Sequence, residues 1–162
     1  MKLSKSKVYV ETSVISYLAA RLSRDLVIAA KQQVTQEWWT MRRHFFECFS
    51  SAVVHDESAA GDPEAAKRRL FLLKDLKVLE ISDDVLRFAK SLIVSGIIPK
   101  KASEDATHVA FATVNRMDFL LTWNCAHIAN AEIRRSLGQF AEKQGFESPI
   151  ICTPEELMGG HS

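Results

Sequence analysis

The fold is decided by a stretch near the start of the chain, Val8-Tyr9-Val10-Glu11-Thr12-Ser13-Val14-Ile15-Ser16-Tyr17-Leu18. Its first three residues are β-branched or aromatic, and such a run predicts a short strand. The residues from Ser13 to Ala20 are typical of a helix, for which Thr12 or Ser13 can serve as the N-cap. The chain is therefore expected to open with a strand that feeds directly into a helix.

The same alternation continues along the rest of the sequence. Further helices are expected over residues 25–48, 65–75, 82–95, 103–115 and 129–144, with Asp62, Ser82 and Ser103 as N-caps, and further strands over residues 52–55, 78–81, 119–122 and 149–152. Short strands alternating with longer helices indicate an α/β fold with a central parallel sheet of about five strands, covered on both faces. No repeat or linker divides the chain, so we expect a single domain over residues 1–158 and a disordered tail over residues 159–162.

Composition and missing motifs limit the possible functions. The 162 residues include 21 Lys and Arg against 20 Asp and Glu, a formal net charge of +1, so the chain has no overall basic field. Any affinity for nucleic acid must come from local patches such as Lys100-Lys101, although such pairs more often form solvated helix faces. The sequence contains no Gly-x-Gly-x-x-Gly, no phosphate-binding loop and no Gly-x-Ser-x-Gly elbow, so nucleotide cofactors and serine hydrolysis lack support.

Cysteine content and hydropathy bear on the location of the protein. Cys48, Cys125 and Cys152 are odd in number and form no Cys-x-x-Cys pair, which argues against a disulfide framework or zinc ribbon and favours reduced, buried thiols. The start of the chain lacks the apolar stretch of a signal peptide, and no apolar run approaches the roughly 18 residues of a membrane span. We therefore expect a cytoplasmic protein without a membrane partner.

Four polar residues, Glu11, Glu57, Asp105 and Asn124, each lie where an apolar run stops or a helix begins. If the apolar runs are neighbouring parallel strands, their carboxyl ends share one rim, where these side chains can converge. Three carboxylates and an amide suggest a site for Mg²⁺ or Mn²⁺, because these ions prefer oxygen ligands and need no His or Cys spacing. Such an ion binds phosphate and activates water for attack on a phosphodiester.

Geometry separates these candidates from neighbouring acidic residues. Asp118 and Asn124 lie at opposite ends of an expected strand, so only Asn124 can share the rim. Asp118 is expected to be a turn residue at the strand entry. Asp56 and Glu57 are adjacent and their side chains diverge, and we favour Glu57 as the one that points inward.

Asp105 and His108 share one face of the expected fourth long helix, three residues apart. Asp105 lies in the first turn, where the helix dipole favours a negative charge, so it is either a metal ligand or an N-terminal charge. We expect Glu104 to be solvated and His108 to be a satisfied core histidine. Three hydroxyls near the rim can cap helices or orient a metal-bound water: Thr12, Ser13 and Thr122.

Four segments, in this order, resemble the PIN-domain family, most closely its VapC-like toxin branch. They are the run from Val8 to Leu18, Glu57 after an expected strand, Glu104-Asp105-Ala106-Thr107-His108-Val109-Ala110, and Asp118-Phe119-Leu120-Leu121-Thr122-Trp123-Asn124. The resemblance extends from about Val8 to Cys152, nearly the whole chain. It implies a three-layer α/β/α fold, and it implies an Mg²⁺- or Mn²⁺-dependent ribonuclease, because the active members of the family have this activity.

The resemblance also implies roles for individual residues. Glu57 and Asp105 match acidic ligands of the family. Asn124 matches the Asp or Asn after the fourth strand, and Ser13 matches the hydroxyl beside the first acid. The first acid is usually Asp, whereas this chain has Glu11. The extra methylene moves the carboxylate by about 1 Å, and misplacement on that scale can lower a rate about a hundredfold.

The leading interpretation is a VapC-type endoribonuclease in which an Mg²⁺- or Mn²⁺-activated water hydrolyses RNA phosphodiester bonds. Glu11, Glu57 and Asp105 are expected to hold the metal, with Asn124 assisting. The expected partners are an RNA substrate, a cognate antitoxin and a second copy of the chain. The helix that carries Trp38 and Trp39 is a candidate surface for an antitoxin or second subunit, although a core role explains these residues equally well.

Two other functions remain open. The first is a non-catalytic PIN module that binds RNA or protein and has lost turnover through Glu11. The second is a receiver-like signalling domain phosphorylated at a strand-end acid. The receiver is disfavoured, because the paired acids expected after a first strand are absent and no lysine follows a late strand at the right place.

Overall fold

A five-stranded sheet forms the centre of the computed structural model, which describes residues 4–159. The strands are β1 (Lys7–Val10), β2 (Glu47–Ser51), β3 (Lys77–Leu79), β4 (Phe119–Leu121) and β5 (Ile150–Cys152). Their order across the sheet is β3-β2-β1-β4-β5, and every neighbouring pair is parallel. The predicted α/β fold with a central parallel sheet of about five strands is confirmed.

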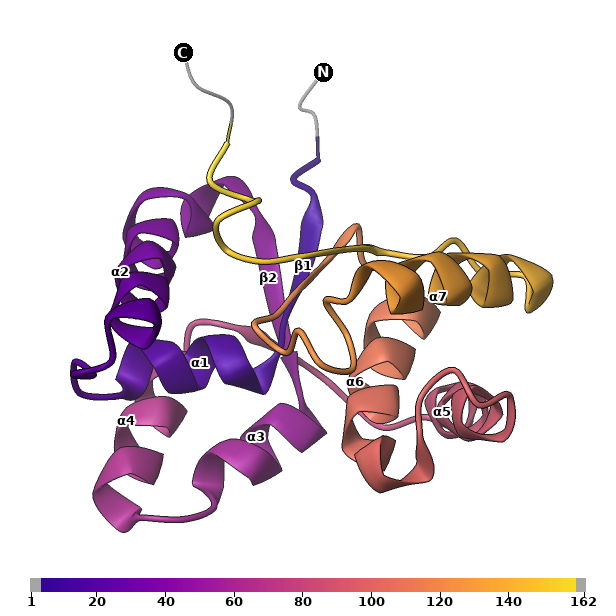
Figure 1. Ribbon diagram of the computed structural model, residues 1–162, viewed down its shortest axis with the longest axis horizontal. Helices are drawn as coiled ribbons and strands as arrows, with labels where there is room; N and C mark the ends of the chain where they lie inside the picture. Colours follow the sequence, from indigo (N-terminus) through magenta and orange to yellow (C-terminus); the bar gives the residue numbers. More distant parts are fainter. Residues whose placement is uncertain (1–3, 160–162) are drawn as a thin grey trace.

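Seven α-helices within the described residues cover the two faces of this sheet. They are α1 (Thr12–Ala19), α2 (Leu26–Met41), α3 (Ala52–Ala59), α4 (Pro63–Leu73), α5 (Asp83–Val94), α6 (Ser103–Val114) and α7 (Ala131–Lys143). Helices α1 to α4 lie on one side of the strands and α5 to α7 on the other, which gives three layers (Figure 1).

The central strand β1 explains why the opening stretch is apolar without a break. Val8, Tyr9 and Val10 are fully buried, since helices cover this strand on both faces. The ring of Tyr9 stacks on Phe111 of α6, with ring centroids 6.2 Å apart. On the other side of the sheet Trp38 of α2 is fully buried and stacks on Phe46. Trp38 is therefore a core residue and is not part of a partner-binding surface.

The strand order places a topological switch point at the carboxyl ends of β1 and β4. From β1 the chain builds β2 and β3 on one side, and it then returns to place β4 and β5 on the other side. Connections diverge at such a switch point, and a ligand crevice opens there. The backbone N–H of Glu11 donates to the carbonyl of Leu121 at 3.0 Å, so the β1–β4 pairing continues up to the rim.

The predicted position of the second strand was wrong. Residues 52–55, expected as a strand, belong to α3, and β2 precedes them at Glu47–Ser51. The expected helix over residues 25–48 ends at Met41, followed by a short 3-10 turn at Arg43–Phe45. An apolar run as short as Ala52–Val54 fits a strand or the buried side of a helix equally well. Ser51 decides the outcome, because its Oγ accepts the Val54 N–H at 3.2 Å and caps α3.

Two of the predicted helix caps were correct, whereas α1 is capped by Glu11 and not by Thr12 or Ser13. Asp62 caps α4 by accepting the Ala65 N–H at 2.9 Å, and Ser82 caps α5. Ser103 does not cap α6. A 3-10 turn at Lys100–Ala102 leads into this helix, so that Ser103 is already its first residue. Of the tail expected to be disordered, residues 160–162 lie outside the described range. No helix within residues 4–159 has both the length and the apolarity to cross a membrane.

The three cysteines are free, as predicted, but they differ in exposure. Cys152 is buried and Cys48 is half-buried, whereas Cys125 is exposed, so the expectation of three buried thiols was wrong. Cys125 lies in the loop that leaves the rim after β4, where no core contact requires burial. Burial raises the pKa of Cys48 to about 11 and that of Cys152 to about 12.

Alkylation of the native protein at pH 8 is expected to modify Cys125 first. Because only the thiolate reacts, about one in a thousand Cys48 side chains, and fewer of Cys152, are reactive at that pH. Iodoacetamide labelling followed by mass spectrometry should show one fast adduct in the native protein and three in denaturant. The Cys125→Ser variant should show no fast adduct, and a second fast site in the native wild type would contradict the described burial.

Candidate active site

Glu11 lies directly after β1 at the rim, and only 5% of its surface is exposed. Its Oε2 accepts the Ser13 N–H at 2.6 Å, which caps α1, and the Thr122 hydroxyl at 3.3 Å. Its Oε1 accepts no hydrogen bond from the described part of the chain, and no Lys, Arg or His there forms an ion pair with it. The rim thus contains a buried carboxylate without a cationic partner.

Glu57 reaches the rim from α3, because the strand expected just before it is a helix. Its Oε1 receives two hydrogen bonds of 2.6 Å, one from the Thr12 hydroxyl and one from Nε2 of His108. The neighbouring Asp56 is exposed, which agrees with the preference for Glu57. His108 is buried and satisfied, as predicted, with Nδ1 hydrogen-bonded to the Tyr9 hydroxyl at 2.7 Å. Its other partner is Glu57, so this core histidine also belongs to the site.

The charges of the three predicted carboxylates all act on His108. Burial lowers the pKa of His108, but the hydrogen bond to Glu57 and the charges of Glu11, Glu57 and Asp105 outweigh it, and the pKa is raised. Burial raises the pKa of Glu57, but the hydrogen bond and charge of His108 and the Thr12 bond outweigh it, and the pKa is lowered. Because its pKa is lowered, Glu57 is ionised at neutral pH. Burial raises the pKa of Tyr9 well above its usual value.

Glu104 is exposed, as expected, yet it lies beside Glu57. The pKa of Glu104 is raised by a hydrogen bond with the Glu57 carboxyl group and then by the charge of Glu57. Two carboxyl groups that compete for a proton in this way form a region of concentrated negative charge. Glu104 is thus a site residue that sequence reasoning missed, since its position in the first turn of α6 is equally typical of a solvated acid.

Asp105 is held by two residues that follow β4. Its Oδ1 accepts a hydrogen bond from Nδ2 of Asn124 at 2.9 Å, and its Oδ2 lies 3.1 Å from Nδ1 of His127. The amide oxygen of Asn124 accepts the His127 N–H at 3.1 Å. Asn124 therefore both binds Asp105 and orients its second partner, His127. Sequence reasoning missed His127, because only the return of this loop past α6 brings it to an acid.

The predicted supporting hydroxyls join β1 and β4 at the rim. Ser13 Oγ accepts the Trp123 N–H at 2.8 Å, and Thr122 Oγ1 accepts the Asn124 N–H at 2.9 Å. Both hydroxyls therefore fix the loop that carries Asn124. Asp118 accepts the Lys7 N–H at the opposite end of β4, as expected for a strand-entry residue.

No protein-family model matches the chain, and no curated protein matches it. The solved structures that match its fold include the following three. The VapC20 toxin of Mycobacterium tuberculosis, which cleaves the sarcin-ricin loop, has a TM-score of 0.58 at 16% identity over 74% of this chain and 92% of that chain. VapBC-1 from nontypeable Haemophilus influenzae gives 0.55 at 12% identity over 92% and 98% of the two chains. VapBC2 from Rickettsia felis, bound to a DNA fragment from its promoter, gives 0.54 at 14% identity over 91% and 98%. The chain has the VapC-like PIN fold.

Glu11 and Asn124 follow β1 and β4, and Asp105 is hydrogen-bonded to Asn124. Whether these residues fit a metal depends on their donor atoms. No three His, Cys, Asp or Glu side chains within residues 4–159 are grouped as a ready-made metal site. Mg²⁺ is usually held by one or two carboxylates together with waters and substrate phosphates, so a three-residue cage is not required. The donors are carboxylate, amide and hydroxyl oxygens, and the buried Glu11 has no cation beside it. The donor set fits a hard divalent ion.

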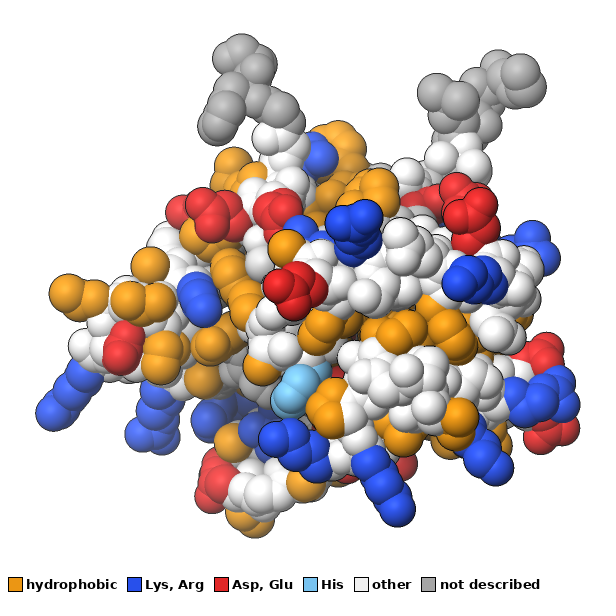
Figure 2. All heavy atoms as spheres, turned by 45° about the vertical axis from the view of Figure 1, so that its right-hand side comes forward, with side chains coloured by type: hydrophobic (Ala, Val, Ile, Leu, Met, Phe, Trp, Pro, Cys, Tyr) orange, Lys and Arg blue, Asp and Glu red, His pale blue; other side chains and the backbone are white. Residues whose placement is uncertain are grey.

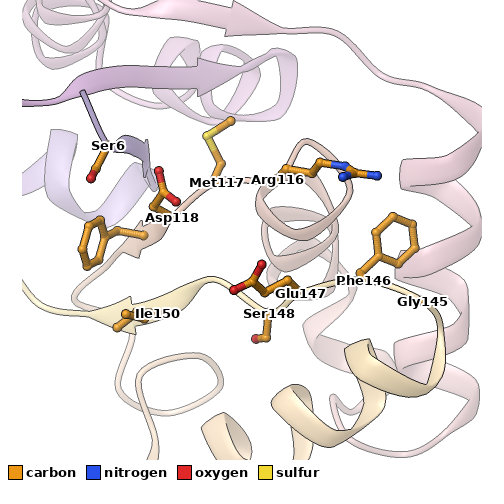
Figure 3. A pocket seen from close by; sticks show the side chains of 10 residues that line it. Ser6, Arg116, Met117, Asp118, Gly145, Phe146, Glu147, Ser148 and Ile150 are labelled. Carbon is orange, nitrogen blue, oxygen red and sulfur yellow. The ribbon is translucent and has the colours of Figure 1, made fainter. Parts of the chain in front are cut away.

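A separate cavity of about 310 Å³ lies at the amino ends of the strands of the PIN fold (Figure 3). Its lining includes Arg116, Asp118, Glu147 and Ser148. Asp118 enters β4 there, whereas Thr122 leaves the same strand at the rim. This cavity is therefore at the opposite end of the sheet from the candidate site.

Proposed function

We propose that this protein is an Mg²⁺- or Mn²⁺-dependent endoribonuclease of the VapC toxin type. The observation that carries the proposal is Glu11, a buried carboxylate at the switch point whose Oε1 accepts no hydrogen bond, and which forms no ion pair, within residues 4–159. The fold shared with the VapC20 toxin supports the same class of activity. A bound divalent ion supplies positive charge that polarises a phosphate and activates water for in-line attack.

The residues of the chain divide the remaining work between them. Glu11 and Asp105 would hold the ion through carboxylate oxygens. Asn124 and His127 orient Asp105 through the hydrogen bonds at its two oxygens. Glu57 adds a further ionised carboxylate, and Ser13 and Thr122 hold the loop after β4 in place. Because Glu11 is shielded from water, its charge acts more strongly than it would at the surface.

RNA is the expected substrate, and its phosphates need basic groups near the crevice. Lys100 and Lys101 are exposed, form no ion pair with any residue between 4 and 159, and directly precede the helix that carries Asp105. Lys and Arg side chains gather along the lower edge of the molecule (Figure 2). With a net charge of only +1, local contacts of this kind favour a structured RNA over indiscriminate backbone binding.

An antitoxin is the expected protein partner, because two of the matching structures are VapBC assemblies. A partner would cover apolar side chains near the start of α2, where Leu22, Leu26 and Val27 are 77%, 85% and 65% exposed. A cluster of exposed apolar side chains marks a contact surface more often than a single exposed apolar side chain does. Leu26 and Val27, with Leu22 just before the helix, replace the buried Trp38 as the candidate surface for an antitoxin or for a second copy of the chain.

The proposal is tested by incubating the purified protein with total RNA and transfer RNA in Mg²⁺ or Mn²⁺. Cleavage should require the ion, stop with chelator and fall about a hundredfold in the Asp105→Asn variant. The matched control is Asp118→Asn, since Asp118 is at the other end of β4 and an Asn there can still accept the Lys7 N–H. Cleavage that survives both chelator and Asp105→Asn would come from a contaminating nuclease and would refute the assignment.

A further inference from the structure

A chain of buried hydrogen bonds runs from the core of the sheet to Glu57. Ser51 Oγ lies 2.8 Å from the Tyr9 hydroxyl, which lies 2.7 Å from His108 Nδ1, and His108 Nε2 lies 2.6 Å from Glu57 Oε1. Ser51 and Tyr9 are fully buried, and His108 is 1% exposed. Among the described residues, two side chains hydrogen-bond Oε1 of Glu57, namely Thr12 and His108, and His108 is anchored in the core.

The chemistry of the partners gives this chain a definite direction. An ionised carboxylate only accepts hydrogen bonds, so the proton between Glu57 and His108 resides on Nε2. In the neutral imidazole Nδ1 then accepts the Tyr9 O–H, and the Tyr9 oxygen accepts the Ser51 O–H. Ser51 Oγ in turn accepts the Val54 N–H. Each of these buried groups thereby has a hydrogen-bond partner, and both nitrogens of the His108 ring are held in place.

The location of Glu57 makes such support necessary. Glu11 directly follows a strand of the sheet, and the backbone alone carries it to the rim. Glu57 instead stands in the second turn of the short helix α3, so a flexible side chain must bridge the distance. Helix α3 is tied to the same network twice, through its N-cap Ser51 and through Glu57.

We propose that His108, held by Tyr9, is a positioning residue that fixes the carboxylate of Glu57 at the rim. The inference rests on the proposed function, because it assigns the purpose of this network to an ion-dependent site. Both the His108 and the Thr12 hydrogen bonds end on Oε1, so neither of them occupies Oε2. Removing a hydrogen bond that orients a metal-binding carboxylate typically lowers metal affinity or activity tenfold to a hundredfold.

The test is the Tyr9→Phe variant, which keeps the ring stacked on Phe111 and removes only the hydroxyl. We expect Mn²⁺ affinity, measured by calorimetry, to fall about tenfold, and kcat for RNA to fall about tenfold with KM changed less than about twofold. The ¹⁵N signal of His108 Nδ1 should shift, because this nitrogen loses its hydrogen bond with the Tyr9 hydroxyl, whereas Nε2 keeps its bond to Glu57. A His108→Gln variant, which can still donate to Glu57, should retain more Mn²⁺ affinity than His108→Ala.

The matched control is Thr113→Val on the same helix. Thr113 is buried, and its hydroxyl donates only to the Val109 carbonyl within α6. This variant should lower thermal stability as Tyr9→Phe does, but leave Mn²⁺ affinity and the His108 signals unchanged. Unchanged Mn²⁺ affinity and ring signals in Tyr9→Phe would overturn the positioning role. If the wild type binds Mn²⁺ but cleaves no RNA, only the proposed function is refuted. The ring signals and the Mn²⁺ affinity would still decide the role of His108.

Discussion

The Glu11→Gln variant is expected to lose RNA cleavage by about a thousandfold while remaining folded. Gln has nearly the same volume as Glu, and its amide oxygen can still accept the Ser13 N–H that caps α1. Only the buried negative charge is removed, and that charge is the one without a protein cation beside it. Mn²⁺ binding by calorimetry should weaken in parallel. The melting temperature should stay the same or rise, because burying an unpaired carboxylate is unfavourable.

The Glu11→Asp variant separates an active nuclease from a PIN module without turnover. Asp keeps the charge and is a favoured N-cap, but it withdraws the carboxylate by about 1 Å, enough to lower a rate about a hundredfold. If the rim is adapted to Glu11, cleavage should fall in Glu11→Asp with little change in stability. A variant that gains Mn²⁺-dependent cleavage over an inert wild type would instead support the non-catalytic module. An active Glu11→Gln variant would remove Glu11 from the proposed site.

Sequence reasoning succeeded where local chemistry determines the structure. The unbroken apolar run of β1 follows from burial on both faces, and the caps at Asp62 and Ser82 are satisfied by hydrogen bonds within their own helices. The position of Asn124 at the rim follows from the direction of β4, because Asp118 precedes this strand at its entry and Asn124 follows it at its exit.

Sequence reasoning failed where contacts distant in sequence decide the structure. β2 reads Glu-Cys-Phe-Ser-Ser, which is a poor strand by composition, and it is extended because β1 and β3 pair with it on both sides. Ser50 and Ser51 are fully buried there. The proximity of Glu104 to Glu57 arises from the packing of α3 against α6, which no local pattern specifies.

Truncation of Phe111 to Ala is expected to destabilise the protein by about 3–5 kcal/mol, a large part of the stability of a domain this size. Phe111 is fully buried on α6 and stacks on Tyr9 at the centre of the sheet, so its removal leaves a cavity that the surrounding core cannot fill. The same helix carries Asp105, Glu104 and His108, so loosening it should also weaken Mn²⁺ binding before the protein unfolds.

Thermal and denaturant unfolding measure this effect, with a decrease in melting temperature of roughly 10 °C. The matched control is Phe71→Ala, since Phe71 is 67% exposed on α4 and its truncation should change stability by less than about 0.5 kcal/mol. Equal destabilisation by the two variants would contradict the described core. Helix α6 connects that core to the rim, so loosening it should affect the acids. If the Phe111→Ala variant melts at a lower temperature but keeps full Mn²⁺ affinity while folded, the loop after β4 alone holds the acids.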